Sequence, residues 1–488
     1  MMNRDIAAGI DSSTQSCTIV LRDLNDGSII AESRIKHPKT TPPCSEQKPE
    51  DWWKALILAF KNLKEYLSRI ACVSVGGQGH GLVILDENYN SLKKAKLWND
   101  TESFKEADYL RKLINDNYWE SYIGSIPAPA LTISKLVWME KNYNDVIKRS
   151  QYIMLPSDYI VFMLTGNNVT ERGVASGTGY FNPYDNIYDE FILDKSLSYK
   201  IINKLPKIVN SNDVVGKVRK IEGIEELEGA FVSVGTGDNM AAAIGLNCKE
   251  NDIVISIGTS GTVYTITTNK ITNTYDGMVN LYADSTNRYM PMLTTLNAAK
   301  VTDAFRYILN CSTNEFDNMV LNDKDMGGDL ILIPYLDGER SPNLPFALGT
   351  LNGIKSNVKR EHIASASIIG VVCNLLEGIN ILKAIGLKCD GKIILTGGGS
   401  NSLAYRQIIS DLAQKEVYVC NYLETAAAGA SLLSASAYKE IDIEYLMEKW
   451  NLGFRKVATP RNNIDINRIV DSYNYYNKKY KECIYEKN

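Results

Sequence analysis

Residues 6–16, IAAGIDSSTQS, decide how the rest of the sequence is interpreted, because they join an apolar strand to a loop rich in hydroxyl groups. Residues 6–11 predict a buried strand, residues 16–23 a second, and the turn at 25–27 leads into a third at 28–35. The chain is therefore expected to open as an antiparallel meander. Residues 252–267, DIVISIGTSGTVYTIT, repeat this plan, which favours two related lobes.

Helices and strands alternate in the remaining sequence, which is typical of an α/β protein. Apolar residues at helical spacing, Trp53, Leu56, Ile57, Phe60, Leu63 and Leu67, predict a helix after the meander. The second half predicts a helix at 359–383, a strand at 392–396, a helix at 403–413, a strand at 417–420 and a helix at 425–437. Residues 468–487 predict a surface helix. Since 488 residues exceed one usual core, we expect a first lobe over 1–247 and a second over 248–488.

Composition excludes several classes of protein. With 44% hydrophobic and 23% charged residues the chain is expected to fold, and a net charge of -4 gives no general attraction to nucleic acid or anionic membranes. The nine cysteines are scattered and only three histidines accompany them, which argues against a disulfide framework or a zinc site. Long apolar runs are interrupted, and the first residues do not form a signal-peptide pattern. We therefore expect a cytoplasmic protein with no nucleic-acid or membrane partner.

Two loops of small polar residues are candidates for binding phosphate. Asp11 ends the first strand and is followed by Ser13, Thr14 and Gln15, whose N–H and hydroxyl groups suit phosphate oxygens while Asp11 faces a magnesium ion. Thr259 and Ser260 repeat this loop in the second half, so the two could hold a triphosphate from both sides. The alternative for each loop is an ordinary hairpin turn.

Asp238 is the candidate catalytic base. It follows Gly235-Thr236-Gly237 and precedes a helical run of small residues. Phosphoryl transfer to a hydroxyl needs a carboxylate to take the proton, and Asp11 with Asp238 supplies both this group and candidate magnesium ligands. The alternative is that Asp238 only caps the helix.

A glycine-rich turn and a polar loop are candidates for the nucleotide and for a sugar. Gly398, Gly399 and Asn401 follow a strand and precede a helix, so backbone could approach a nucleotide there, or the glycines could simply form a tight turn. The candidate sugar contacts are Gln78, Gly79, His80, Trp98, Asp100 and Asn239. A tryptophan buried in the core is the alternative for Trp98. His37 and His362 stand beside charged residues and are expected in solvent.

Taken together, these segments resemble the FGGY carbohydrate kinases over nearly the whole chain. The first and second phosphate motifs of that family are similar to residues 8–16 and 256–261, and its adenosine motif is similar to residues 395–400 and 424–430. Residues 132–139, 155–159 and 334–342 also resemble family segments. The resemblance implies a two-lobed actin-like ATPase (ribonuclease H-like) fold in which each lobe is a mixed β-sheet with flanking helices. It also implies MgATP as phosphoryl donor and Asp238 as general base.

Within the family, the chain looks most like the enzymes that phosphorylate D-xylulose to D-xylulose 5-phosphate. In those enzymes a Gln-Met-His-Gly stretch touches the ketose, whereas residues 78–81 here are Gln-Gly-His-Gly. Kinases of ribulose, fuculose or gluconate share the phosphate and adenosine motifs and remain alternatives, as does an actin-like ATPase without a sugar acceptor. The sequence leaves the oligomeric state open, a homodimer included.

Overall fold

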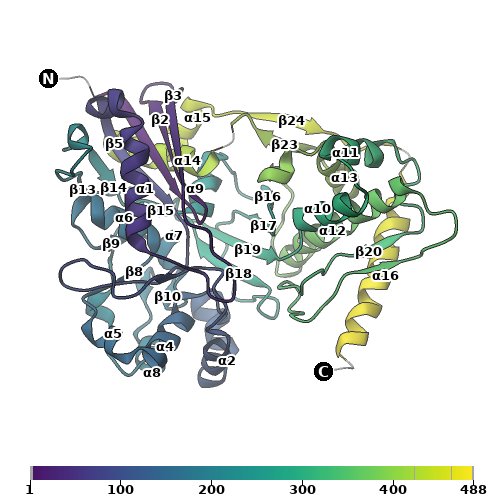
Figure 1. The fold of residues 1–488 in the computed structure, drawn as a ribbon, viewed down its shortest axis with the longest axis horizontal. Coiled ribbons are helices and arrows are strands. Elements are labelled where there is room, and N and C mark those ends of the chain that lie inside the picture. Colours follow the sequence, from purple (N-terminus) through teal and green to yellow (C-terminus); the bar gives the residue numbers. More distant parts are fainter. Residues whose placement is uncertain (1–3, 423, 463, 486–488) are drawn as a thin grey trace.

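The first lobe is built on the predicted meander, which becomes the edge of a larger mixed sheet (Figure 1). This computed structural model describes residues 4–422, 424–462 and 464–485. In spatial order the strands of the first sheet are β13 (Val214–Lys217), β14 (Phe231–Ser233), β5 (Ile70–Gly77), β1 (Ile6–Ser12), β2 (Ser16–Asp23) and β3 (Ile29–Lys36). β1 pairs antiparallel with β2 and parallel with β5, so it lies inside the sheet and is almost wholly buried.

Alternate residues of β1 pack against different helices on the two faces of the sheet, as the period of a strand requires. Ile6, Ala8 and Ile10 share a core with α1 (Pro49–Lys61) and α6 (Pro156–Thr165). Ala7 belongs to a second cluster with α14 (Thr425–Lys439) and α15 (Ile443–Trp450). The predicted helix after the meander is therefore present, although it stops at Lys61, and it buries Trp52 rather than Trp53.

The second lobe repeats the plan with another mixed sheet. Its strands are, in spatial order, β18 (Val279–Ala283), β19 (Tyr289–Thr295), β17 (Gly261–Thr265), β16 (Ile253–Ile257), β22 (Ile393–Thr396), β23 (Val417–Cys420) and β24 (Phe454–Ala458). The helices of this lobe are α10 (Ala299–Ile308), α11 (Thr313–Asn322), α12 (Arg360–Ala384), α13 (Leu403–Ala413) and α16 (Ile466–Tyr485). α16 covers one side of the lobe (Figure 1), and Ile469 and Tyr473 anchor it in the core.

α12 is the central helix of this second core. Within the described residues it is the one helix long and apolar enough to cross a membrane, but 83% of its most apolar window is buried inside the protein. It packs between β17, α11 and α13. The burial explains its apolar composition as that of a core helix.

Helices α9 (Asp238–Gly245) and α14 cross closely, and both contact β5 of the first sheet. A Cβ added to Gly245 would lie 2.0 Å from the carbonyl oxygen of Thr425, and one added to Gly429 would lie 1.8 Å from that of Ala241. Glycine at both positions lets the backbones touch. α14 and α15 come from the second half of the sequence, yet they pack on the first sheet. The boundary between the two lobes at residue 247 therefore stays a prediction.

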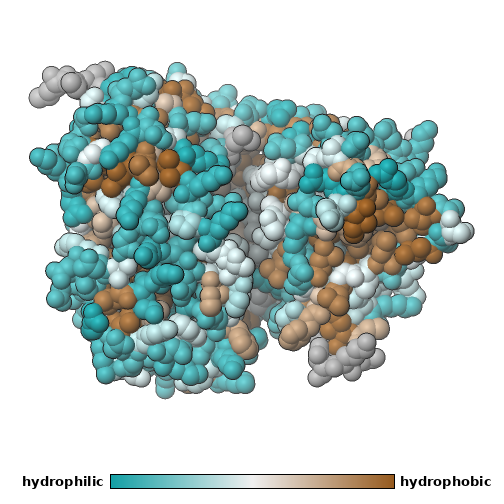
Figure 2. Space-filling model, viewed as in Figure 1, coloured by the Kyte–Doolittle hydropathy of each residue, from teal (hydrophilic) through white to brown (hydrophobic). Residues whose placement is uncertain are grey.

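Further helices form the lower part of the first lobe (Figure 1), beyond the end of β5. They share one apolar cluster that includes Trp119, Leu136 and Tyr180. The helices here are α2 (Phe104–Leu113), α4 (Thr132–Asn142), α5 (Asn144–Arg149) and α8 (Glu190–Ser196), whereas the short helix α7 (Arg172–Ala175) contacts β18. On the face in Figure 2 a furrow separates the two lobes.

Candidate active site

The two acidic residues predicted to carry the chemistry lie at neighbouring strand ends of the first sheet. Asp11 is aligned with Gly76 of β5, and Thr236 of β15 (Thr236–Gly237) is aligned with the same glycine from the other side. Asp238 follows as the first residue of α9. The strand register therefore brings two carboxylates, distant in the sequence, into one place.

The environment of Asp11 suits a bound cation. Burial, and after it the charge of Asp238, raises the pKa of Asp11 to about 8. Its Oδ1 is buried and has no hydrogen-bond partner. Close carboxylates with an unsatisfied oxygen fit a magnesium ion, because the ion offsets their repulsion and takes the free oxygen as a ligand.

Asp238 does not act as a helix cap, because Gly237 holds the N-cap position. Oδ1 of Asp238 accepts hydrogen bonds from the backbone and side-chain N–H groups of Asn239, at 2.7 and 3.0 Å. No described residue donates to Oδ2. Burial raises the pKa of Asp238 to about 6. The carboxylate is therefore ionised at neutral pH, with one oxygen free to accept a proton.

The predicted sugar loop continues directly from β5. His80 has a positive φ of 62°, and its Nδ1 lies 2.7 Å from the carbonyl oxygen of Gly177, which makes Nδ1 the donor. Nε2 lies 3.3 Å from the hydroxyl of Tyr282 on β18. Burial lowers the pKa of His80 to about 4, so the ring is neutral. Gln78 adds a buried amide nitrogen, Nε2, that has no partner.

Trp98 and Thr14 connect this loop to the first phosphate loop. The indole N–H of Trp98 donates to Oγ1 of Thr14 at 2.9 Å, and that hydroxyl donates to Oε1 of Gln78 at 3.1 Å. Gln47 donates to the carbonyl oxygen of Thr14 as well. The hydroxyl of Thr14 therefore joins the two loops. Trp98 is half-buried at their junction, so it is not an ordinary core tryptophan.

Asp100 lies at the base of this region, and its oxygens are occupied. It is fully buried and forms an ion pair with the equally buried Lys96 at 3.2 Å. It also accepts hydrogen bonds from the backbone N–H groups of Ser45 and Glu102. The structure therefore gives Asp100 a role in holding the loop that carries Trp98.

His37 corrects the expectation of a solvated side chain. It is buried, and its Nδ1 lies 2.9 Å from the carbonyl oxygen of Ser13 in the first phosphate loop. Its backbone N–H bonds the carbonyl oxygen of Gln15, whose side chain is exposed. His37 thus stabilises the first phosphate loop, a contact that its charged neighbours in the sequence did not predict. His362 is also buried, 3.7 Å from Asp325.

The nucleotide residues predicted in the second lobe line one large pocket. Its volume is about 780 Å³, and it is lined by Thr259, Gly398, Gly399 and Asn401 together with residues of α10 and α11. A Cβ on Gly398 would meet nothing within 4 Å, so this glycine leaves the pocket open. Ser260 lies in the turn between β16 and β17 and is not among the lining residues.

Several residues of this pocket were not predicted from the sequence. They come from α10, α11 and α13, and they include Asp303, Arg306, Phe316, Asp317 and Tyr405. None lies in a recognisable motif. Only the packing of α10 and α11 beside the glycine-rich turn shows that they share one pocket.

Comparisons with known proteins identify the family of the chain. Residues 6–245 match the N-terminal domain of the FGGY family of carbohydrate kinases, and residues 253–438 match its C-terminal domain. The chain is 32% identical to a xylulose kinase from Streptomyces coelicolor over 95% of each chain. It is 32% identical to one from Haemophilus influenzae over 90% of this chain and 92% of the other.

Solved structures show the same architecture. The xylulose kinase from Bifidobacterium adolescentis has a TM-score of 0.83 at 27% identity, over 97% of this chain and 99% of that one. Gluconate kinase from Lactobacillus acidophilus has a TM-score of 0.86 at 23% identity, over 98% and 96%. The fold is thus the predicted two-lobed actin-like ATPase fold, and the chain belongs to the FGGY family of carbohydrate kinases as an ATP-dependent sugar kinase.

Proposed function

We propose that the protein transfers the terminal phosphoryl group of ATP to D-xylulose, forming D-xylulose 5-phosphate. The observation that carries this proposal is the pair Asp11 and Asp238 beside the polar loop of Gln78 and His80. The choice of D-xylulose is supported by the curated relatives, several of which are xylulose kinases.

Asp238 acts as the general base in the proposed reaction. Its free Oδ2 takes the proton of the acceptor hydroxyl while that oxygen bonds to the terminal phosphorus of ATP, and the bond from phosphorus to the leaving oxygen of ADP breaks. Asn239 holds the other oxygen and so fixes the orientation of the carboxylate. Gln78 would donate its free amide N–H to a sugar hydroxyl, and neutral His80 would accept a hydrogen bond from another at Nε2.

Asp11 and Asp238 are the residues that would hold Mg²⁺. When bound, the ion supplies positive charge that neutralises the phosphate oxygens during transfer. Thr259, Gly398, Gly399 and Asn401 would hold the nucleotide in the pocket of the second lobe, and the loop of Ser13, Thr14 and Gln15 would face its phosphates.

A second acceptor class remains within the same family. The gluconate kinase fold is closely similar, and a Cβ on Gly79 would meet nothing within 4 Å, so the sugar loop leaves space that another acceptor could fill. Because the chain belongs to a family of sugar kinases, the alternative of an ATPase without a sugar acceptor does not hold. We also propose a cytoplasmic location, which the nine free cysteines support.

The experiment is a coupled assay of the purified protein with MgATP and a panel of D-xylulose, ribulose, fuculose, gluconate and glycerol. We expect the highest kcat/KM with D-xylulose, and Asp238→Asn to lower kcat by about 10² to 10⁴-fold, the usual contribution of a general base. Circular dichroism of the variant controls for folding. A higher kcat/KM with another acceptor would overturn the substrate, and an active Asp238→Asn variant would overturn the base.

A further inference from the structure

The loop of residues 334–342, between β20 (Ile331–Ile333) and β21 (Thr350–Asn352), has no role in the reaction described so far. It carries Glu339, a carboxylate that is 1% exposed. A buried charge is costly unless its surroundings satisfy it with hydrogen bonds or an opposite charge. The partners of Glu339 therefore indicate what this loop does.

Five hydrogen-bond donors among the described residues surround Glu339. Its Oε1 accepts the backbone N–H groups of Leu296 at 2.6 Å and of Arg340 at 2.7 Å. Its Oε2 accepts hydrogen bonds from three side chains, those of Thr295, Asn297 and Asn374, at 2.5, 3.0 and 3.3 Å. A buried carboxylate shared by several donors fixes their positions, because leaving any of these donors unpaired is costly. Glu339 thus joins its loop to the end of β19.

Asn297 forms a second connection between the same two segments. It is fully buried, its Nδ2 donates to the carbonyl oxygen of Gly338 at 2.7 Å, and its Oδ1 accepts the backbone N–H of Leu336 at 3.1 Å. Nearer the surface, Asp337 forms an ion pair with Lys300 of α10 at 3.1 Å. The loop therefore bonds the end of β19 and the start of α10 at several points.

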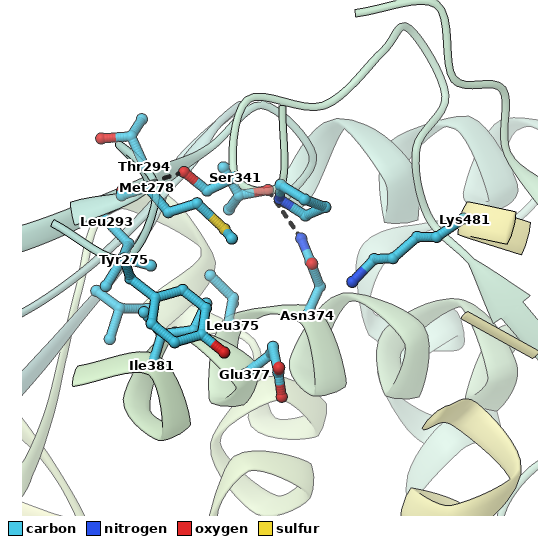
Figure 3. A pocket seen from close by; sticks show the side chains of 14 residues that line it. Tyr275, Met278, Leu293, Thr294, Ser341, Asn374, Leu375, Glu377, Ile381 and Lys481 are labelled. Atoms are coloured by element: carbon cyan, nitrogen blue, oxygen red, sulfur yellow. Dashed lines mark hydrogen bonds between the residues drawn. The ribbon is translucent and has the colours of Figure 1, made fainter. Parts of the chain in front are cut away.

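Asn374 connects this network to the central helix of the second lobe. It points up from α12 (Figure 3), and its Nδ2 donates to Oγ1 of Thr295 at 2.9 Å as well as to Glu339. Together with Ser341 and Pro342, these two residues line a cavity of about 180 Å³ behind the loop. The hydrogen bonds of Glu339 are thus tied to the core of the lobe.

The segment that Glu339 holds is bonded in turn to the second phosphate loop. The backbone N–H of Ala298 donates to the carbonyl oxygen of Thr259 at 3.3 Å, and that of Ala299 donates to the carbonyl oxygen of Gly258 at 2.9 Å. Ala298 is the N-cap residue of α10 and has no capping side chain, so the carbonyl of Gly258 takes one of the N–H groups that begin this helix. The position of the phosphate loop therefore depends on the start of α10.

Thr259 is the residue through which this dependence reaches the nucleotide pocket. Its side chain is exposed, and it lines the pocket together with Gly258 and Ala299. Hydroxyl and backbone N–H groups bind phosphate oxygens well only when distance and direction are both correct. A change in the Glu339 network would shift the start of α10 and, with it, the groups that face the pocket.

We propose that Glu339 is a positioning residue for the second phosphate loop, which it holds in place for the phosphate groups of ATP by fixing the end of β19 and the start of α10. This inference rests on the proposed function, because it assumes that ATP binds in this pocket with its phosphates at Thr259. Affinity for the phosphate groups then depends on Glu339, whereas affinity for adenosine and for the sugar does not.

The test measures dissociation constants for ATP and for adenosine by calorimetric titration, and KM for the sugar acceptor, in Glu339→Gln. The amide keeps the shape of the side chain, but its nitrogen cannot accept hydrogen bonds from Asn297 and Asn374. We expect ATP to bind about tenfold more weakly or worse, the usual cost of a lost hydrogen bond to a charged group, with adenosine affinity and sugar KM unchanged. Asn374→Ala, which removes one donor, should give a smaller change in the same direction.

Asp252→Asn is the matched control for a loss of stability. Asp252 is also a buried carboxylate of the second lobe, and it accepts the backbone N–H groups of Lys249 and Lys392 at 3.0 and 2.9 Å. It precedes β16, whereas Gly258 follows that strand, so the two lie at opposite ends of it. Asp252→Asn should lower the melting temperature and leave ATP affinity unchanged.

Two results in Glu339→Gln would overturn the inference. One is wild-type affinity for ATP, and the other is an equal loss of affinity for ATP and adenosine, which would mean that Glu339 supports the whole pocket and not the phosphate loop. If Glu339→Gln does not fold, the same comparison in Asn374→Ala decides. A wild type that binds ATP but does not phosphorylate D-xylulose would refute the proposed function, and the binding comparison would still judge the role of Glu339. A wild type that does not bind ATP would overturn both.

Discussion

Gly79 sets the space available beside the acceptor. Its φ is not positive, and a Cβ there would meet nothing within 4 Å. Neither the backbone conformation nor the packing therefore requires glycine at this position. We expect Gly79→Met to change the ratio of kcat/KM between small and large acceptors by about tenfold or more, because the side chain fills space beside Gln78 and His80. KM for ATP should stay constant.

A matched control for this substitution is Gly81→Ala in the same loop. Its Cβ would lie 2.5 Å from Cγ of Pro156, so this smaller change should lower the melting temperature while Gly79→Met should not. An unchanged acceptor ratio in Gly79→Met would show that the open space lies outside the sugar site.

The pH dependence of the reaction should report on Asp238. Its pKa is raised to about 6, and only the ionised carboxylate accepts the proton, so the active fraction falls as pH falls through this value. We expect kcat/KM for the sugar to level off above about pH 7 and to fall roughly tenfold per pH unit well below pH 6. The profile should be measured at several Mg²⁺ concentrations, because an ion held by Asp11 and Asp238 lowers the pKa of both carboxylates and moves the fall to lower pH. A profile that stays flat down to pH 5 at the lowest Mg²⁺ concentration that supports turnover would contradict this role.

Residue types in the site were predictable from the sequence, but their partners were not. The order of loops identified Asp11, Asp238 and His80 as candidates. That the hydroxyl of Thr14 is engaged by Trp98 and Gln78 depends on contacts across loops that no spacing encodes. The ion pair of Asp100 with Lys96, four residues earlier, depends on the burial of both side chains, which the sequence does not show, so Asp100 was predicted as a sugar contact without this partner.

At the scale of elements, the crossing of α9 and α14 depends on two glycines. Because a Cβ on Gly429 would lie 1.8 Å from the carbonyl oxygen of Ala241, Gly429→Ala should force the helices apart. We expect a loss of about 1 to 3 kcal/mol in the free energy of unfolding, measured by denaturant titration. Gly398→Ala is the matched control for stability, since its Cβ has open space. Equal stability of the two variants would contradict the close crossing.

The ends of a helix were predicted best where capping residues define them. α13 begins and ends at the predicted residues 403 and 413, because Ser402 caps it and Gln414 ends it in a left-handed conformation. α1 ends earlier than its apolar spacing suggested, since residues 64–69 form a 3-10 turn that leads into β5. Periodicity predicts which residues are buried more reliably than where a helix stops.

At the scale of the whole molecule, the sequence order of the chain differs from its spatial order. α14 and α15 lie between β23 and β24 of the second sheet in sequence, but they share a core with Ala7, Leu24 and Ala71 of the first lobe. A repeat of strand and loop motifs predicted two lobes. The repeat could not predict that α14 and α15 pack on the first sheet, because by composition alone the small-residue face of α14 fits either sheet.

Hydrogen exchange followed by mass spectrometry tests this arrangement. D-xylulose should slow exchange in β5 and also in α14 and α15, because these helices are packed with the first sheet. A non-hydrolysable ATP analogue alone should mainly protect α10, α11 and residues 398–405, which line its pocket. If the ATP analogue protected α14 and D-xylulose did not, the stability of this helix would be coupled to the second lobe. Because the sugar loop bonds to Tyr282 of β18, both ligands together should protect that strand more than either alone.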